Sequence, residues 1–180
     1  ASQMTTMGAD AYAQLQEKEP VIEDGPLVDY VQCVTDAIVP QIPEAYRDQA
    51  WEVSVFESEQ VNAFALPGGK MGVYTGLLDV AENADQLAAV VGHEIAHVMA
   101  EHANERMSTQ MATVVGLGAI RIAAGDDPDR QRAMAALGLG AQVGIILPFS
   151  RLHESEGDEI GLELMANAGF GVVGWCSVPA

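Results

Sequence analysis

Two short segments at the start of the chain show helical character. Residues 1–24 mix small and polar residues, and Glu19-Pro20 marks the end of a short predicted helix. Over residues 26–39 apolar residues recur at helical spacing, with Pro26 suited to a first turn and Pro40 placed beyond the end. The pattern therefore predicts two consecutive helices.

From Trp51 the hydrophobic pattern changes to alternation. Residues 51–56 and 61–66 alternate, and Pro67-Gly68-Gly69 separates the second run from a third one at residues 71–75. Because a glycine turn between two alternating runs is typical of a hairpin, we expect a small antiparallel sheet of about three strands.

Two longer helices are predicted in the second half. Asn83 and Gln86 form a capping pair at the start of a helix that runs to about Arg106. A last helix begins near Ser150 and ends at Asn167-Ala168-Gly169, where glycine is the usual stop.

Between these helices lies an apolar stretch rich in alanine and glycine. Its second half, residues 133–149, is 17 residues long without a formal charge, at the lower edge of membrane-span length. A buried core helix is the favoured interpretation, and membrane contact is the alternative.

Composition limits the possible partners. The chain has 180 residues, 26 of them Asp or Glu and 8 Lys or Arg, with a formal net charge of −18. Such a chain lacks the basic surface that phosphate backbones require, so nucleic acid is excluded as a partner. Its two cysteines, Cys33 and Cys176, lie far apart in sequence, and one bridge or two free thiols remain open.

The chemistry of the chain is indicated by His93-Glu94-Ile95-Ala96-His97 in the middle of the strongest predicted helix. Residues four apart on a helix differ by about 40°, so both imidazoles leave the same face and can hold one zinc ion. Glu94 projects beside the metal, where it can take a proton from metal-activated water. The alternative is an amphipathic helix with two histidines on its polar face.

A catalytic zinc needs a third protein ligand. His102 lies about 160° around the helix from the other two, among apolar residues, so a core histidine is the favoured interpretation. Glu154 and Asp158 share one face of the last helix, where one carboxylate could bind zinc and the other could bond a ligand histidine. Gly161 would let this helix approach another closely. A solvated acidic face is the competing interpretation, and His153 adjoins these candidates.

Three motifs in this order resemble one known family. In chain order, the motifs that carry the resemblance are the segment 61–69 with Val73-Tyr74-Thr75-Gly76, the histidine motif, and residues 150–158 (Ser-Arg-Leu-His-Glu-Ser-Glu-Gly-Asp). With these motifs the chain resembles the CAAX prenyl protease/HtpX/BepA/LoiP group of zinc metallopeptidases. The resemblance covers residues 25–170 and is closest to the periplasmic lipoprotein-type members. It implies an α+β, predominantly helical, zincin-like domain with a small antiparallel sheet beside the zinc-bearing helix.

The resemblance assigns residues to roles. It implies that His93, His97 and Glu154 bind one Zn²⁺, that Glu94 is catalytic, and that Asp158 supports a ligand histidine. The family usually has alanine where Gly157 stands. The strand formed by Asn62, Ala63, Phe64 and Ala65 would be the edge against which an extended peptide lies.

The resemblance also frames the whole chain. It implies an N-terminal segment at residues 1–24, a metallopeptidase domain at 25–170 and a short tail at 171–180. It further implies residence on the periplasmic side of the bacterial envelope, with membrane association through a lipid anchor that this chain does not contain.

The function expected from these features is zinc-dependent endopeptidase action on unfolded or misassembled polypeptides, in envelope quality control. The alternative is a zinc-stabilised, chaperone-like peptide-binding module with weak or no proteolysis. The intact Glu94 favours the enzyme, because a pure binding module has no need for a general base.

Overall fold

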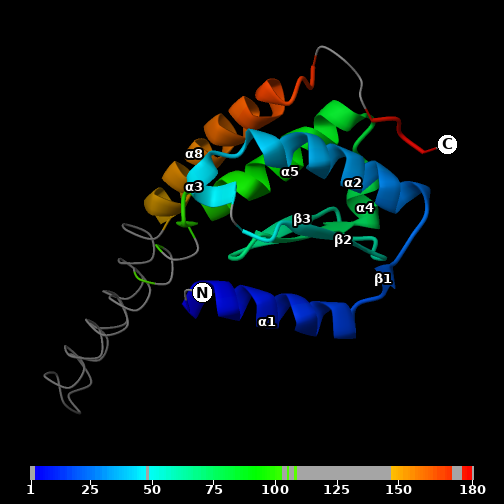
Figure 1. Cartoon of the computed structure of the whole chain (residues 1–180), viewed down its shortest axis with the longest axis horizontal. Helices are drawn as coiled ribbons and strands as arrows, with labels where there is room; N and C mark the ends of the chain where they lie inside the picture. Colours follow the sequence, from blue (N-terminus) through cyan, green and yellow to red (C-terminus); the bar gives the residue numbers. More distant parts are fainter. Residues whose placement is uncertain are drawn as a thin grey trace, which may run out of the picture. The chain divides into compact units, whose positions relative to one another are not determined.

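The protein is described by a computed structural model, which covers residues 3–47, 49–102, 105, 108, 147–171 and 176–179 (Figure 1). Residues 1–101 together with 156–180 form one compact unit, and residues 102–155 form a second. The helical elements of the first unit are α1 (Gln3–Lys18), α2 (Pro26–Ile38), the 3₁₀ turn η1 (Val39–Gln41), α3 (Glu44–Arg47), α4 (Thr75–Leu78) and α5 (Ala84–Met99). Helix α8 (Leu147–Asn167) begins in the second unit and ends in the first.

The sheet of the first unit is mixed and has four strands in the order β1-β2-β4-β3. Its strands are β1 (Val21–Ile22), β2 (Glu52–Phe56), β3 (Ala63–Leu66) and β4 (Lys70–Tyr74). The β1/β2 and β3/β4 pairs are antiparallel, and β2 and β4 are parallel. The predominantly helical α+β class is thus confirmed, whereas the expectation of a purely antiparallel sheet is wrong in this one pairing.

The parallel pair results from the loop between β2 and β3. Residues 57–62 pass over the end of β4, where the Gly76 N–H donates to the Ser58 carbonyl at 2.8 Å and the Tyr74 N–H to the Asn62 carbonyl at 3.1 Å. Strand β3 therefore does not pair with β2. It lies at the edge of the sheet, and the hairpin places β4 between β3 and β2. Strand alternation in the sequence does not reveal such a crossing, because it carries no information on which strands are neighbours.

One face of the sheet packs against α2 and α5 and forms the main core (Figure 1). Val55, Met71 and Val73 point from the strands to this side, where all three are at most 2% exposed. They meet the apolar stripes of the two helices, including Val31, Val34 and Ile38 of α2 and Leu87, Val91 and Ile95 of α5. The sequence pattern of residues 26–39 predicted the first of these stripes.

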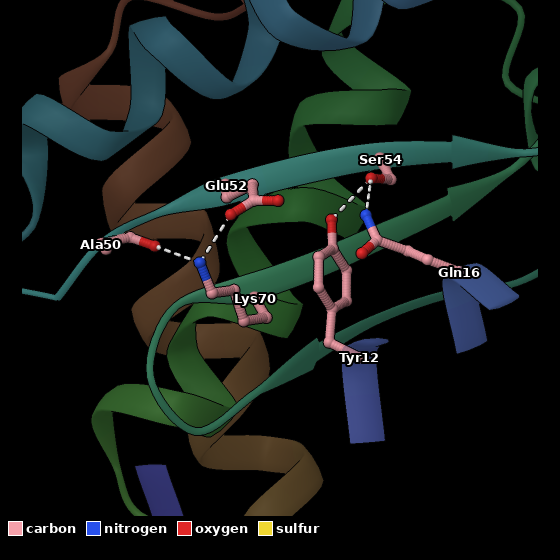
Figure 2. A network of polar contacts seen from close by, with 6 residues as sticks. All are labelled: Tyr12, Gln16, Ala50, Glu52, Ser54 and Lys70. Atoms are coloured by element: carbon pink, nitrogen blue, oxygen red, sulfur yellow. Dashed lines mark hydrogen bonds and ion pairs between the residues drawn. The ribbon is translucent and has the colours of Figure 1, made fainter. Parts of the chain in front are cut away.

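Helix α1 covers the opposite face of the sheet, where a small aromatic cluster forms its core. Tyr12 packs edge-on against Phe56, with ring centroids 6.5 Å apart, and its hydroxyl donates to Ser54 Oγ at 2.7 Å (Figure 2). Burial raises the pKa of the Tyr12 hydroxyl, so it remains a protonated donor at neutral pH. The short helix expected within residues 1–24 is confirmed.

A disulfide joins Cys33 on α2 to Cys176 in the C-terminal tail, with Cα atoms 5.9 Å apart. The tail is also held at Gly171, whose N–H donates to an Asp85 carboxylate oxygen at 2.8 Å. Helix α8 ends at Asn167 and is followed by Gly169 at φ 88°, which matches the predicted stop. The pairing of the two cysteines, left open by the sequence, is thereby settled as a bridge.

Within the described part of the chain, no helix combines the length and apolar character needed to cross a bilayer. Most of the apolar stretch at residues 133–149 lies outside the described residues, so its interpretation as a core helix stays a prediction. The predicted division at residues 24 and 170 likewise stays a prediction.

Candidate metal centre

Helix α5 begins as the sequence predicts. Asn83 is the N-cap, and its side-chain oxygen accepts from the Gln86 N–H at 3.0 Å. The Gln86 side chain in turn accepts from the Glu82 N–H at 2.9 Å, one residue before the position that a capping box uses. This reciprocal cap fixes where the helix starts and hence which residues face the core.

His93 and His97 leave α5 on the same face, one turn apart. Their Nε2 atoms lie 2.9 Å from each other, and their rings are nearly perpendicular at 86°. Both residues are partly buried, and the apolar residues Val91 and Ile95 occupy the opposite side of the helix in the core. Two imidazole nitrogens that converge on one point can hold a single metal ion.

Helix α8 reaches this face through close backbone contact with α5. A Cβ built on Gly161 would lie 2.7 Å from the His93 backbone nitrogen, and one on Gly92 would lie 2.7 Å from the Gly161 carbonyl oxygen. At Gly157 a Cβ would lie 3.2 Å from Cε1 of both His93 and His97. The close approach expected at Gly161 is thus present, and Gly157 lies directly against the imidazole rings.

Asp158 makes the polar contact across this helix pair. Its Oδ1 lies 2.9 Å from His93 Nδ1. A carboxylate at this position accepts a hydrogen bond from the Nδ1–H, so the proton stays on Nδ1 and Nε2 keeps its lone pair for a metal. A carboxylate can orient a metal-binding histidine in this arrangement; the role that the resemblance implied for Asp158 stays a prediction.

Glu154 lies one turn before Asp158 on the same continuous helix. Since residues three and four apart share a helix face, Glu154 lies on the face of Gly157 and Asp158 that meets the two histidines. One carboxylate oxygen of Glu154 and one nitrogen of each histidine lie within 4.8 Å of one another, the only such group among the described residues. These are the three residues that the resemblance implied as zinc ligands, and their role as ligands stays a prediction.

The comparison with known families decides the classification. Residues 28–176 match the model described as "Peptidase family M48". The chain belongs to peptidase family M48. Because that match includes both α5 and α8, the histidine pair and the two carboxylates lie inside the region that defines the M48 relationship.

Similar M48 proteins come from several organisms. The chain is 40% identical over 125 residues to "Mitochondrial metalloendopeptidase OMA1" of Schizosaccharomyces pombe. This match covers 68% of this chain and 35% of the relative. It is 34% identical over 142 residues to the bovine "Metalloendopeptidase OMA1, mitochondrial", covering 77% and 26%. It is 28% identical over 169 residues to "Beta-barrel assembly-enhancing protease" of Escherichia coli K12, covering 91% and 34%. The chain thus spans about a third or less of these relatives, which are named as proteases.

Strand β3 occupies one edge of the sheet in this M48 chain. Ala63 is buried and Ala65 packs against the main core, whereas Phe64 turns to the α1 side and joins the aromatic cluster. Asn62 precedes the strand and is exposed, with its carbonyl bonded to the Tyr74 N–H. All four predicted residues thus lie at the β3 edge of the described sheet. The groups of β3 that a ligand could contact at this edge are its backbone N–H and C=O groups.

The remaining two histidines form a pair of their own in the second unit. His102 and His153 are 1% and 2% exposed, and their rings stack with centroids 4.1 Å apart. His153 Nε2 also contacts Glu105 Oε2 at 2.8 Å. The prediction that His102 is buried is confirmed, with another histidine as its ring neighbour.

Helix α5 is shorter than predicted. It ends at Met99 instead of near Arg106, and Glu101 follows with φ 53°. A left-handed residue is a common helix stop, but glycine or asparagine is the usual signal for it. With glutamate at that position, the sequence gives no warning of the break. Sequence reasoning also missed Gly92, whose place directly before the histidine motif was the available signal.

Proposed function

We propose that this chain is the catalytic region of a zinc-dependent endopeptidase that cleaves unfolded or misassembled polypeptides. The observation that carries the proposal is the convergence of His93 and His97 Nε2 at 2.9 Å, with Asp158 bonded to the opposite nitrogen of His93. A histidine pair that only faced solvent would need no carboxylate to fix its tautomer.

The donor set fits zinc. Two imidazole nitrogens and one carboxylate oxygen are the three protein ligands found in one type of catalytic zinc site, in which a fourth position stays open. His93, His97 and Glu154 would hold the ion. When bound, zinc supplies a Lewis acid that lowers the pKa of a water molecule and polarises a peptide carbonyl.

Glu94 carries the proton chemistry. It follows His93 directly, so its side chain leaves α5 about 100° from that of His93, beside the ligand face. There its carboxylate would take the proton of the attacking water and then donate it to the nitrogen of the departing amine. A general base of this kind contributes about 10²- to 10⁴-fold in rate.

The substrate would bind as an extended strand along β3. Main-chain groups of an edge strand recognise backbone rather than side chains, which suits a broad range of unfolded sequences. Folded proteins would be excluded because their segments are already paired. Asn62, Ala63, Phe64 and Ala65 would define this binding edge.

The disulfide supports a compartment outside a reducing cytosol. We place the protein on the periplasmic side of the bacterial envelope, in quality control, a role in keeping with its similarity to the bacterial β-barrel assembly-enhancing proteases. Similarity to mitochondrial relatives makes a mitochondrial compartment the competing assignment.

The decisive experiment compares wild type and Glu94→Gln with a matched control, Glu163→Gln, at an exposed position of α8. We expect one zinc per chain in all three proteins, cleavage of an unfolded protein by wild type and control, and a rate about 10²- to 10⁴-fold lower for Glu94→Gln. Equal cleavage by Glu94→Gln would contradict the mechanism. Zinc and peptide binding without cleavage by wild type would instead identify a binding module.

A further inference from the structure

Helix α1 lies close to the turn between β3 and β4. A Cβ built on Gly8 would lie 2.1 Å from the Pro67 carbonyl oxygen, so only glycine lets the helix lie at this position. One turn earlier on α1, Thr5 Cγ2 lies 3.0 Å from the place where a Cβ on Gly68 would stand. Two successive turns of α1 thus touch the same hairpin turn.

The turn is closed by one hydrogen bond of its own, from the Gly69 N–H to the Leu66 carbonyl at 3.2 Å. Gly68 and Gly69 adopt φ values of 96° and 80°, and neither has a side chain to pack. The Gly68 N–H donates to Gln49 Oε1 at 3.1 Å, which holds the turn from the segment before β2. The Glu52 N–H of β2 also donates to the Gly69 carbonyl at 2.9 Å. Contact with α1 is a further support, and it comes from an element outside the sheet.

Helix α1 is itself anchored on the centre of the sheet. The Tyr12 hydroxyl and the Gln16 amide both donate to Ser54 Oγ on β2, at 2.7 and 3.1 Å (Figure 2). The aromatic cluster under α1 includes Phe64 of β3, whose ring centroid lies 5.9 Å from that of Phe56. The helix therefore connects the fixed middle of the sheet to its edge strand.

The edge strand needs this support because β4 is its one strand partner in the described sheet. We propose that α1 is a positioning element for substrate: it holds the Pro67–Gly69 turn, and through it the backbone edge of β3 on which an extended peptide would pair. The inference rests on the proposed role of that edge. It makes residues that the resemblance placed outside the metallopeptidase domain part of the peptide-binding apparatus.

A change that displaces α1 is expected to raise KM and to leave kcat nearly unchanged. The contacts of α1 described above are with the sheet and its hairpin turn, whereas the metal-binding histidines project from α5. Misalignment of one or two main-chain hydrogen bonds to the peptide predicts a KM roughly 5- to 30-fold higher. The zinc content should not change.

The test compares Gly8→Val with Ala13→Val, which places the same valine side chain at an exposed position of α1. Both variants are made in the full, zinc-loaded chain and assayed with a labelled unfolded casein, together with zinc per chain and thermal midpoint. We expect the higher KM only in Gly8→Val, with kcat within about twofold of wild type. An unchanged KM in folded Gly8→Val would overturn the proposal, as would a fall in kcat accompanied by zinc loss.

A second variant covers the case in which Gly8→Val does not fold. Tyr12→Phe keeps the ring and removes only the bond to Ser54, so a smaller KM increase in the same direction is expected. Equilibrium binding of an uncleaved peptide, measured with Gly8→Val or Tyr12→Phe in a Glu94→Gln background, separates this inference from the proposed catalysis. If Glu94→Gln cleaves as fast as wild type, the catalytic proposal fails. If binding is unaffected by either α1 variant, the role of α1 fails.

Discussion

Two of the close backbone contacts in the described part of this molecule pair a glycine-bearing helix with another element, and each depends on that glycine. Between α5 and α8 the contact is made by Gly92 and Gly161, and it presents Asp158 to His93. Between α1 and the β3–β4 turn it is made by Gly8, and it meets the Pro67 carbonyl. In the proposed enzyme, the first contact aligns the metal ligands and the second aligns the strand that binds substrate.

The difference lies in what surrounds the glycines. Around Gly161 the neighbouring atoms belong to the backbone of α5, which cannot rotate away. Around Gly157, one turn earlier, they are the tips of imidazole rings, which can shift by a few tenths of an ångström. The same added methyl group should therefore have very different consequences at two positions of one helix face.

The largest effect is expected for Gly161→Ala. Its Cβ would meet the His93 backbone nitrogen and Cα at 2.7 and 2.8 Å, so the helices must separate. We expect the free energy of unfolding to fall by about 3 kcal/mol, measured by urea denaturation. Leu162→Ala, at a 63% exposed neighbour, is the control and should change it by less than about 0.5 kcal/mol. Equal stability of the two variants would show that the close contact is not needed.

A smaller effect, confined to metal binding, is expected for Asp158→Asn. The amide is nearly isosteric with the carboxylate, but it is an uncharged and weaker acceptor that can also turn its NH₂ group to His93 Nδ1, so it holds the proton there less firmly. We expect zinc affinity to fall about 10- to 100-fold in a competition titration with a chromophoric chelator. The exposed Glu159→Gln is the matched control on the next residue of α8. Identical zinc affinities for the two variants would show that Asp158 does not contribute to zinc binding.

The smallest effect is expected for Gly157→Ala, the residue that the resembling family usually has. Alanine favours a helix interior over glycine by about 1 kcal/mol, which offsets the small shift required of the two rings. Zinc binding should persist and the free energy of unfolding should change by less than about 1 kcal/mol. A loss of unfolding free energy as large as that of Gly161→Ala would show that imidazole rings tolerate an added methyl group no better than a helix backbone does.

How much the sequence predicted follows from what each residue type reveals. Histidines four apart on a capped helix, and carboxylates four apart on another, are visible because helical periodicity fixes which side chains share a face. The meeting of the two helices was foreseeable at Gly161, since a small residue in a helix permits close approach.

What the sequence could not predict depends on interactions between distant segments. The parallel pairing of β2 and β4 arises from where the loop 57–62 crosses, and the early end of α5 from a left-handed glutamate at residue 101. The contact of Gly8 with Pro67 joins residues 59 positions apart, and a single glycine in a short N-terminal helix gives no hint of its partner.

The Cys33–Cys176 bridge closes a covalent ring around most of the chain, with a sequence separation of 143. A single cut of any peptide bond between these two cysteines opens the ring without releasing a fragment. A chain nicked by its own activity would therefore keep its apparent mass on a non-reducing gel and separate into two pieces only after reduction. Self-cleavage in such a protein is therefore detected only on a gel run after the Cys33–Cys176 disulfide has been reduced.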